Sequence, residues 1–497
     1  MKTARWILVF AALALGSDRT LAQTPQIDGL SHAAIERSGR LVVAGSGFSG
    51  AQGTVRIDGH LALVTSWADQ RIVSYVPEAA GPGPVLVQVV TGAGPSNAVP
   101  LEVRLRRPTR RVAWRFALDS DYMIHRPAIA PDGTVYVNGI GGRLYALGRG
   151  GALKWIFDTG GQGAQGPVAV GPDGSVYVVG DPVGPEVHLF ALDAAGTVRW
   201  IFTDANTQGV IAGPSVGPDG NVYLVTDIGG AGVVALSPAG QVLWTDTGNP
   251  TVQELGQIGA EIVFGPSQPG SPADQLYVAF DMGGAQPARL FAFGLQGGQR
   301  FSVQTGAQTD VFLQFQAQPA VGSQGELYLT SSRSPTGWLL ERFDPLTGQV
   351  LWSYQGWPAN GMSMPDIGQD GTAYMAHSLG HLVAVAPSGI EQWHFTDGTI
   401  VGGPVASPDG SLLLTGGRPA FGVPGFFRAF RSSGELHWQV DLGLENGGQL
   451  APETRARFTP DGSRAYIGAL ILADDEENEY CYVYALDVQP LTLAPAR

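Results

Sequence analysis

The chain has 497 residues, with 29 Lys and Arg against 43 Asp and Glu, and a formal net charge of −14. This acidic balance argues against nucleic acid as a partner, because affinity for phosphates depends on Lys and Arg. The single cysteine, Cys481, excludes an intramolecular disulfide, and no stretch after residue 22 is apolar for long enough to cross a bilayer.

Residues 1–22 have the features of a secretory signal peptide. Lys2 and Arg5 precede an apolar run over residues 6–15, and small residues surround a cleavage point at Ala22. The run is too short for a transmembrane helix, and a buried N-terminal helix is the alternative interpretation. No cysteine follows the run, so the sequence offers no lipid anchor. We expect a periplasmic or secreted protein without a membrane span.

Residues 24–103 form a separate unit of short predicted strands. Apolar residues alternate in "RLVVAGSGF", "GTVRIDG", "RIVSYVP" and "PVLVQVV", between turns rich in Gly, Pro and Asp. This pattern is typical of a β-sandwich. The pieces "GSGF" (45–48), "SWADQRIVSYVP" (66–77) and "GPSNAVPLEV" (94–103) are similar in order and spacing to the immunoglobulin-like IPT/TIG family. The resemblance implies a spacer or protein-contact module without catalysis.

A basic segment, "RLRRPTRR" at residues 104–111, follows the sandwich. We interpret it as an interdomain linker that rests on the acidic remainder of the chain. A basic arm for nucleic acid is the alternative, which the export signal disfavours.

Two sequence templates alternate from residue 112 to residue 489. One begins with Ala and reaches Trp about nine residues later, as in "ALDAAGTVRW" (191–200) and "AFRSSGELHW" (429–438). The other joins Pro, alternating apolar residues, Pro-Asp-Gly and a Tyr-centred strand, as in "PAIAPDGTVYV" from Pro127. Repeats at intervals of roughly 40–50 residues with four strands each are typical of a β-propeller.

The repeats predict an all-β protein with eight blades in a closed ring. The Trp of the first template, or its Phe substitute, occurs at Trp114, Trp155, Trp200, Trp244, Phe301, Trp352, Trp393 and Trp438. Trp114 has no hairpin partner before it, and "YVYALDVQ" (482–489) has no Trp strand after it. Pairing of these segments would place the first and last strands in one blade and leave no open sheet edge. Residues 490–497 remain as a C-terminal tail.

The first template resembles the tryptophan docking motif of the PQQ-like propeller family. The nearest copy is "RFDPLTGQVLW" (342–352), with Asp344, Thr347, Gly348 and Trp352 at the positions of that motif. The resemblance extends from Trp114 to about residue 489 and implies the fold. The family includes quinoprotein alcohol dehydrogenases as well as non-catalytic members of the BamB type, so the resemblance leaves the function open.

No metal site is expected. The Asp of each Pro-Asp-Gly corner is explained by turn formation, and calcium loops need further carboxylates that these turns lack. We interpret "HSLGH" (377–381) as a hairpin corner rather than a zinc pair, and the acidic "ADDEENE" (473–479) as a solvated loop, with calcium binding as the alternative. Cys481 alternates with two tyrosines on a strand, which favours a buried inert thiol.

Two enzyme classes are alternatives to a binding function. Quinoprotein dehydrogenases typically carry vicinal cysteines beside the quinone, and a haem-bearing subgroup has Cys-x-x-Cys-His; neither feature is present, which disfavours PQQ with calcium as a cofactor. Propeller enzymes that act on polysaccharides need a His, Tyr, Arg or carboxylate set in a cleft. The His125-Arg126 pair beside Tyr122 is the compact cluster of that kind in this sequence.

The favoured function is an exported, non-enzymatic binding or scaffold protein, which we expect to be a monomer. Its partner is a protein, a carbohydrate or a small molecule. The segments that join each Trp strand to the next blade vary most, and variable loops on a regular scaffold are where recognition usually lies; a plug of the central channel is the alternative. The candidate contact residues are Tyr122, His125, Arg126, Asn206, Gln316, Trp357, Asn360 and Arg455.

Overall fold

The computed structural model describes most of the chain from residue 23 onward. The described residues are 23–106, 108, 111–119, 125–139, 141–160, 166–180, 187–204, 210–227, 231–246, 261–268, 270–280, 287–308, 319–333, 337–355, 363–377, 380–418, 423–442, 444–445, 448–452, 454–472 and 481–488. Contacts between Cα atoms divide them into two compact units: one contains residues 23–37 and Leu41–Arg104, and the other contains the residues from Leu105 onward together with Ser38–Arg40. The described residues contain no helix that is long and apolar enough to cross a membrane.

The first unit is a β-sandwich of two sheets, with strand orders β1-β3-β7-β6 and β2-β10-β8-β4-β5, and with β9 paired to β8. Its strands are β1 (Gln26–Leu30), β2 (Ala34–Glu36), β3 (Arg40–Ser46), β4 (Thr54–Ile57), β5 (His60–Leu61), β6 (Leu63–Trp67), β7 (Arg71–Tyr75), β8 (Gly83–Thr91), β9 (Gly94–Pro95) and β10 (Val99–Arg104). Alternate residues of β8 (Val85, Val87 and Val89) are buried, whereas Leu86 between them is exposed. The alternation predicted from the sequence therefore corresponds to one face packed in the core.

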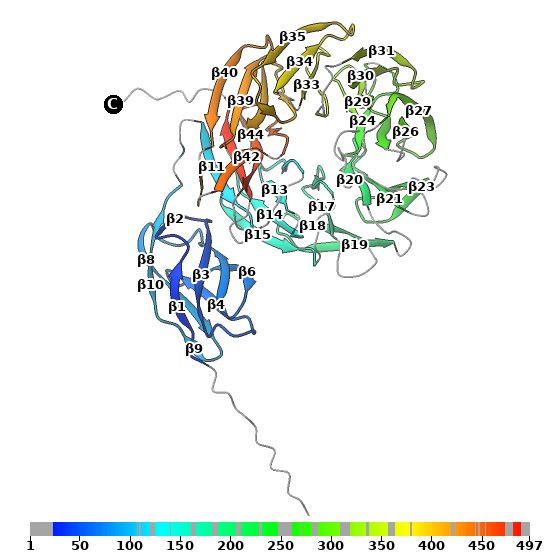
Figure 1. Ribbon diagram of the computed structural model, residues 1–497. Helices are drawn as coiled ribbons and strands as arrows, with labels where there is room; N and C mark the ends of the chain where they lie inside the picture. The colour runs from blue at the N-terminus through cyan, green and yellow to red at the C-terminus, as the bar shows by residue number, and fades with distance from the viewer. Residues whose placement is uncertain are drawn as a thin grey trace, which may run out of the picture. The chain divides into compact units, whose positions relative to one another are not determined.

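The second unit consists of eight sheets that follow one another around a ring (Figure 1). The first four blades are β12 (Ala128–Ile129), β13 (Val135–Asn138), β14 (Arg143–Leu147) and β15 (Leu153–Asp158); β16 (Ala169–Val170), β17 (Val176–Gly180), β18 (Val187–Leu192) and β19 (Val198–Asp204); β20 (Val210–Val216), β21 (Val222–Asp227), β22 (Ala231–Leu236) and β23 (Val242–Asp246); and β24 (Val263–Gly265), β25 (Gln275–Phe280), β26 (Pro287–Gly294) and β27 (Gln299–Gln308).

The remaining four blades complete the ring, and the last takes one strand from the start of the unit. They are β28 (Ala320–Val321), β29 (Leu327–Arg333), β30 (Gly337–Phe343) and β31 (Val350–Gln355); β32 (Asp366–Ile367), β33 (Ala373–His377), β34 (His381–Val385) and β35 (Glu391–Thr396); β36 (Ile400–Val401), β37 (Val405–Ala406), β38 (Leu412–Arg418), β39 (Phe426–Arg431) and β40 (Leu436–Asp441); and β41 (Leu444–Glu445), β42 (Gly448–Pro452), β43 (Arg457–Phe458), β44 (Arg464–Leu472), β45 (Cys481–Asp487) and β11 (Val112–Ala117). We number these blades 1 to 8 in the order given.

The ring closes by pairing of its first and last strands, as the sequence predicts. Strand β11 runs antiparallel to β45, with Trp114 opposite Ala485 and Phe116 opposite Val483. The described part of the basic linker also contacts the propeller, because Arg106 donates from Nε to the carbonyl of Gly150 at 3.0 Å. Closure leaves blade 8 with a full set of partners on both sides of β45.

Both sequence templates are explained by a row of three side chains across each blade. In blade 1, Tyr136, Ala146 and Trp155 lie side by side on β13, β14 and β15. The Tyr136 and Trp155 ring centroids are 5.6 Å apart, because the small Ala146 lets the rings meet across the middle strand. The same Tyr–Trp or Tyr–Phe contact recurs in blades 2, 3, 4, 5, 6 and 8. The template residues are therefore packing residues of the blade.

The Trp of each row also joins its blade to the next one. The indole of Trp155 donates to the carbonyl of Ala194 in blade 2 at 2.9 Å, three residues after the template Ala191. Equivalent bonds of 2.8–3.0 Å join Trp114 to Arg149, Trp200 to Pro238, Trp244 to Leu295, Trp352 to Pro387 and Trp393 to Ser432. Gly196 lies under the Trp155 ring, where a Cβ atom would come within 2.7 Å of the indole.

Two of the eight junctions lack this bond, and other donors occupy the equivalent carbonyl. Where Phe301 replaces Trp, the Gln275 amide donates to the carbonyl of Pro345 at 2.7 Å. At the closing junction, the indole nitrogen of Trp438 is buried and has no partner among the described residues. There Arg111 donates to the carbonyl of Val488 at 2.9 Å, and its guanidinium lies 5.1 Å from the Trp438 ring centroid.

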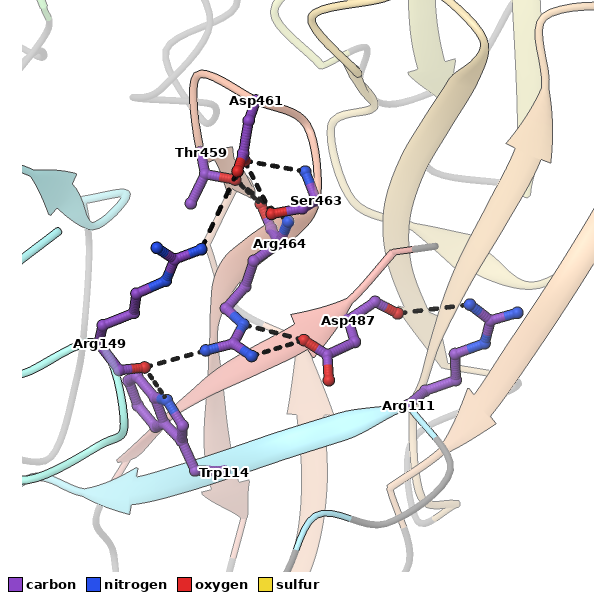
Figure 2. A network of polar contacts seen from close by, with 8 residues as sticks. All are labelled: Arg111, Trp114, Arg149, Thr459, Asp461, Ser463, Arg464 and Asp487. Carbon is purple, nitrogen blue, oxygen red and sulfur yellow. Dashed lines mark hydrogen bonds and ion pairs between the residues drawn. The ribbon is translucent and has the colours of Figure 1, made fainter. Parts of the chain in front are cut away.

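The closing blade is tied to blade 1 by a polar network (Figure 2). The carbonyl of Arg149 accepts both the Trp114 indole and Nη1 of Arg464, each at 2.9 Å. Arg464 in turn pairs with Asp487 on the neighbouring strand at 2.7 Å. Asp461, in the turn before β44, accepts from Ser463 as a Pro-Asp-Gly corner is expected to do. The seam therefore combines the repeated indole bond with a guanidinium bond to the same carbonyl.

We predict that Gly196→Ala destabilises the propeller more than Gly174→Ala does. Both glycines have a positive φ, of 83° and 82°, so both substitutions carry a similar backbone strain. A Cβ atom at Gly174 meets open space, whereas one at Gly196 collides with Trp155. The free energy of unfolding, measured by urea denaturation, is expected to fall by about 1–3 kcal/mol more for Gly196→Ala. Equal losses would contradict the packing role of this glycine.

We also predict that deletion of residues 111–118 destabilises the whole propeller. The deletion removes β11, exposes the edge of β45, and takes away the donor to Val488. A lower melting temperature and concentration-dependent aggregation are expected, measured by calorimetry and by size-exclusion chromatography. An unchanged melting profile would show that the pairing does not stabilise the ring.

Candidate binding site at the centre of the propeller

The first strand of each regular blade lies at the centre of the ring. Strands β12 and β16, β16 and β20, β24 and β28, β28 and β32, and β32 and β37 contact each other although they belong to neighbouring blades. First strands meet in this way only around the axis of a propeller. These first strands therefore surround the central region.

The pairing register identifies equivalent positions on these strands. The residue opposite the template Tyr, or opposite Leu414 in blade 7, is Ala128, Ala169, Ser215, Val263, Ala320, Asp366, Val405 or Arg457. The residue two positions earlier is Arg126, Pro167, Gly213, Glu261, Met364, Gly403 or Arg455 in the seven blades where it is described. Positions two apart on a strand share one face. Charged residues from blades 1, 4, 6 and 8 therefore occupy a ring whose other members are uncharged and mostly small.

Arg126 and Glu261 form an ion pair across the centre of the ring. Arg126 precedes β12 in blade 1 and Glu261 precedes β24 in blade 4, so two whole blades separate them. Nε of Arg126 donates to Oε1 of Glu261 at 2.6 Å, and Nη2 donates to Oε2. Burial acts to raise the pKa of Glu261, but Arg126, with smaller contributions from Arg457 and Arg455, lowers that pKa to about 2. The carboxylate is therefore ionised and both of its oxygens are bonded.

Asp366 and Arg455 form a second pair, which joins blades 6 and 8. Nη2 of Arg455 lies 2.9 Å from Oδ1 of Asp366, and the other carboxylate oxygen accepts the backbone N–H of Ala406 at 2.7 Å. Arg455 also donates to the carbonyl of Pro404 at 3.3 Å. Between 17% and 23% of each side chain in the two pairs is exposed. Both pairs are therefore shielded but reachable by water.

Arg457 is the third guanidinium of this group. It makes no hydrogen bond or ion pair with any residue that the structure describes. The charge of Arg126, followed by burial, lowers the pKa of Arg457 to about 10, although Glu261 and Asp366 act in the opposite direction. A lowered pKa means that the surroundings disfavour the charged form. We name Arg126, Glu261, Asp366, Arg455 and Arg457 the central charge cluster.

His125 adjoins the central charge cluster in sequence and differs from it in charge. Burial lowers the pKa of His125 to about 4, and the charge of Glu261 opposes this shift only in part. The imidazole is therefore neutral near pH 7. At that pH the cluster contains three positive and two negative side chains.

The structure describes three of the eight predicted contact residues. His125, Arg126 and Arg455 lie in the central region, and Arg126 and Arg455 belong to one cluster. Tyr122, Asn206, Gln316, Trp357 and Asn360 lie outside the described residues. The sequence analysis missed Glu261, Asp366 and Arg457; the available signal was a charged residue at a first-strand position where other repeats have Pro or a small residue.

The other sequence motifs lie elsewhere. The segment 377–381 is the hairpin corner expected from the sequence, since His377 on β33 pairs with His381 on β34. Cys481 is a buried cysteine on β45, and the burial agrees with the sequence. The acidic run 473–479 lies outside the described residues. Within the parts of the chain that are described, no three His, Cys, Asp or Glu side chains are grouped to hold a metal ion.

We predict that His125 makes the propeller less stable in weakly acidic solution. Its folded pKa of about 4 is lower than the ordinary value of 6.5, so the unfolded chain binds a proton more readily. Above about pH 6.5 His125 is neutral in both states and the propeller keeps its full stability. As the pH falls towards 4, protonation of His125 in the unfolded chain lowers the free energy of unfolding. His125→Gln is expected to lose less of its melting temperature than the wild type between about pH 7 and 4.5. His60→Gln, on an exposed strand of the sandwich, is the control; equal pH profiles for wild type and His125→Gln would contradict the prediction.

Comparisons with known proteins agree with both units. The family described as outer membrane protein assembly factor BamB matches residues 102–354, and the IPT/TIG domain family matches residues 25–103. A search of curated proteins found no match. Among solved structures, BamB from Moraxella catarrhalis is 17% identical with a TM-score of 0.52, over 75% of this chain and 98% of that one. The Dos1 propeller is 12% identical with a TM-score of 0.52, over 75% and 93%.

These structural likenesses are low in identity and show the propeller fold alone. The family match is broader, because residues 102–354 make up just over half of the 497 residues. It begins at the end of the sandwich and continues through blade 5. The protein therefore belongs to the PQQ-like propeller family described as outer membrane protein assembly factor BamB, and it carries an IPT/TIG domain before the propeller.

Proposed function

We propose that this protein is an exported, non-enzymatic binding or scaffold protein that holds a partner at the mouth of the propeller channel. The observation that carries the proposal is the central charge cluster, to which blades 1, 4, 6 and 8 contribute. A regular ring with non-repeated polar groups at its centre is suited to recognition. Membership of a family described as an assembly factor supports a protein as the partner, ahead of a carbohydrate or a small molecule.

The protonation states of the cluster favour binding over acid–base catalysis. A general acid or base works best with a pKa near the operating pH. Glu261 has a pKa of about 2 and His125 a pKa of about 4, so neither group gains or loses a proton readily near pH 7. Arg126, which belongs to the His-Arg-Tyr set considered for a polysaccharide-active enzyme, donates from Nε and Nη2 to the two carboxylate oxygens of Glu261.

The proposed contact surface combines the described residues with the connecting segments. Tyr122 and Trp357 are proposed as apolar contacts for the partner, and Asn206, Gln316 and Asn360 as polar ones. Residues 1–22 are proposed as the export signal, so mature protein from its native host should begin near Gln23. Full-length protein retained in the cytoplasm would contradict export.

The test is partner capture by a tagged protein in its native host, with cross-linking and mass spectrometry. We expect Tyr122→Ala with Trp357→Ala to abolish recovery of the partner polypeptide and to leave the melting temperature nearly unchanged. Arg126 is left intact, because its removal would leave Glu261 unpaired. The control replaces two exposed apolar residues of outer strands, Leu243 and Leu351, with Ala. Capture that survives the first pair of changes but not the second would move the contact surface to the outer rim.

A second measurement addresses the dehydrogenase alternative. Purified protein is incubated with PQQ and calcium and then freed of unbound cofactor. We expect no quinone absorbance and no dye reduction with alcohols. Retained quinone with turnover would overturn the non-enzymatic assignment.

A further inference from the structure

We propose that the central charge cluster binds one anionic group, a carboxylate or a phosphate, through the guanidinium groups of Arg455 and Arg457. This inference rests on the proposed function and adds the chemistry of the group that is bound. It is carried by the charge count of the cluster and by guanidinium donors that no described residue uses.

Each oxygen of the two carboxylates in the cluster already accepts a hydrogen bond, and none of these bonds comes from Arg457. Both oxygens of Glu261 accept from Arg126, and the two oxygens of Asp366 accept from Arg455 and from the backbone N–H of Ala406. Among the described residues of the cluster, three guanidinium groups therefore face two carboxylates that are already paired. The positive charge that remains is placed where a single external anion would compensate it.

Unused hydrogen-bond donors lie at the same place. Nε of Arg455 is buried and has no partner among the described residues. Arg457, two residues further along the chain, is exposed and is bonded to none of them either. A buried donor without an acceptor costs about 1–3 kcal/mol. Donors from two neighbouring guanidinium groups match the oxygens of a carboxylate or phosphate.

The neighbouring residues leave space for Arg455. A Cβ atom at Gly403 would lie 3.2–3.3 Å from Cγ, Cδ and Nε of Arg455, so the side chain runs along the bare backbone of blade 7. Ala128, on the strand after Arg126, and the small residues at equivalent positions add little bulk to the centre. The arrangement holds Arg455 in place beside Asp366, with its buried Nε against the backbone of Gly403.

The experiment titrates the full chain with defined anions at constant ionic strength, using calorimetry and thermal shift. The probes are acetate, inorganic phosphate, and the peptides acetyl-Ala-Ala-Glu-amide and acetyl-Ala-Ala-Gln-amide. Binding of acetate and of the Glu peptide, but not of the Gln peptide, assigns a carboxylate. Binding of phosphate alone assigns a phosphate group. Both results support the site, and the absence of binding by every probe overturns it.

Arg457→Gln is the decisive variant, because Arg457 makes no bond within the described structure and its removal relieves repulsion from Arg126. We expect an unliganded melting temperature equal to or above that of the wild type, and anion binding weaker by about tenfold or more. Arg431→Gln, at an exposed position of blade 7 where Arg431 pairs with Glu435, is the matched control and should bind as the wild type does. Unchanged binding by Arg457→Gln would overturn the assignment.

Failure of this inference and failure of the proposed function give different results. If no anion binds but the Tyr122→Ala and Trp357→Ala variant still loses its partner, the anion site is wrong and the binding function stands. If anions bind at Arg457 but the protein also turns over an alcohol with PQQ, the proposed function is wrong and the anion site stands. Gly403→Ala provides an independent check, because it should weaken anion binding by displacing Arg455 while both ion-paired carboxylates remain.

Discussion

The bond from a Trp indole to a carbonyl of the next blade is the constraint on which the ring depends. The indole must reach a carbonyl three residues after the template Ala, and its ring must lie on a glycine in the same turn. Both conditions fix the distance between one blade and the next. The residue between the Tyr and the Trp is less constrained: it is Ala146 in blade 1 but Arg342 in blade 5, where the Tyr328 and Trp352 ring centroids are still 5.8 Å apart. The Trp and the turn Gly, which look unrelated in the sequence, therefore meet in one contact.

At the two junctions without an indole bond, another side chain donates to the equivalent carbonyl, so a donor to this carbonyl is present whether or not a Trp supplies it. A buried carbonyl without a donor is costly, and each exceptional junction supplies a replacement from a different part of the structure. Gln275 comes from a strand within blade 4, whereas Arg111 comes from the segment before β11. At the closing junction the guanidinium also covers the face of Trp438. That junction therefore keeps its aromatic packing and its satisfied carbonyl while the indole nitrogen itself remains unbonded.

The fold followed from the sequence because its information is local and repeated eight times. The Ala-to-Trp spacing and the Pro-Asp-Gly corners each predict a hairpin, and the unmatched Trp114 and "YVYALDVQ" predict closure; the pairing of β11 with β45 confirms it. The candidate site is harder to predict from the sequence, because each of its residues occurs only once and the residues come from blades far apart in the chain. Arg126 and Arg455 were singled out as members of variable segments. Glu261 and Asp366 were not, since no local pattern in the sequence shows that a side chain meets a partner from a blade that is not its neighbour.

Closure has a consequence for the order in which this chain acquires its structure. Arg111 and the carbonyl that it bonds are separated by 377 positions, so this contact forms only after nearly all of the chain has been synthesised. Until then the seven completed blades form an open ring, in which β11 is unpaired and the last completed sheet has an exposed edge. Contacts of such long sequence separation slow folding and prolong the lifetime of species that aggregate. The pairing of β45 with β11 is therefore expected to be the rate-limiting step of folding. A chain that ends before Cys481 would remain an open, aggregation-prone ring, even if its individual blades had folded.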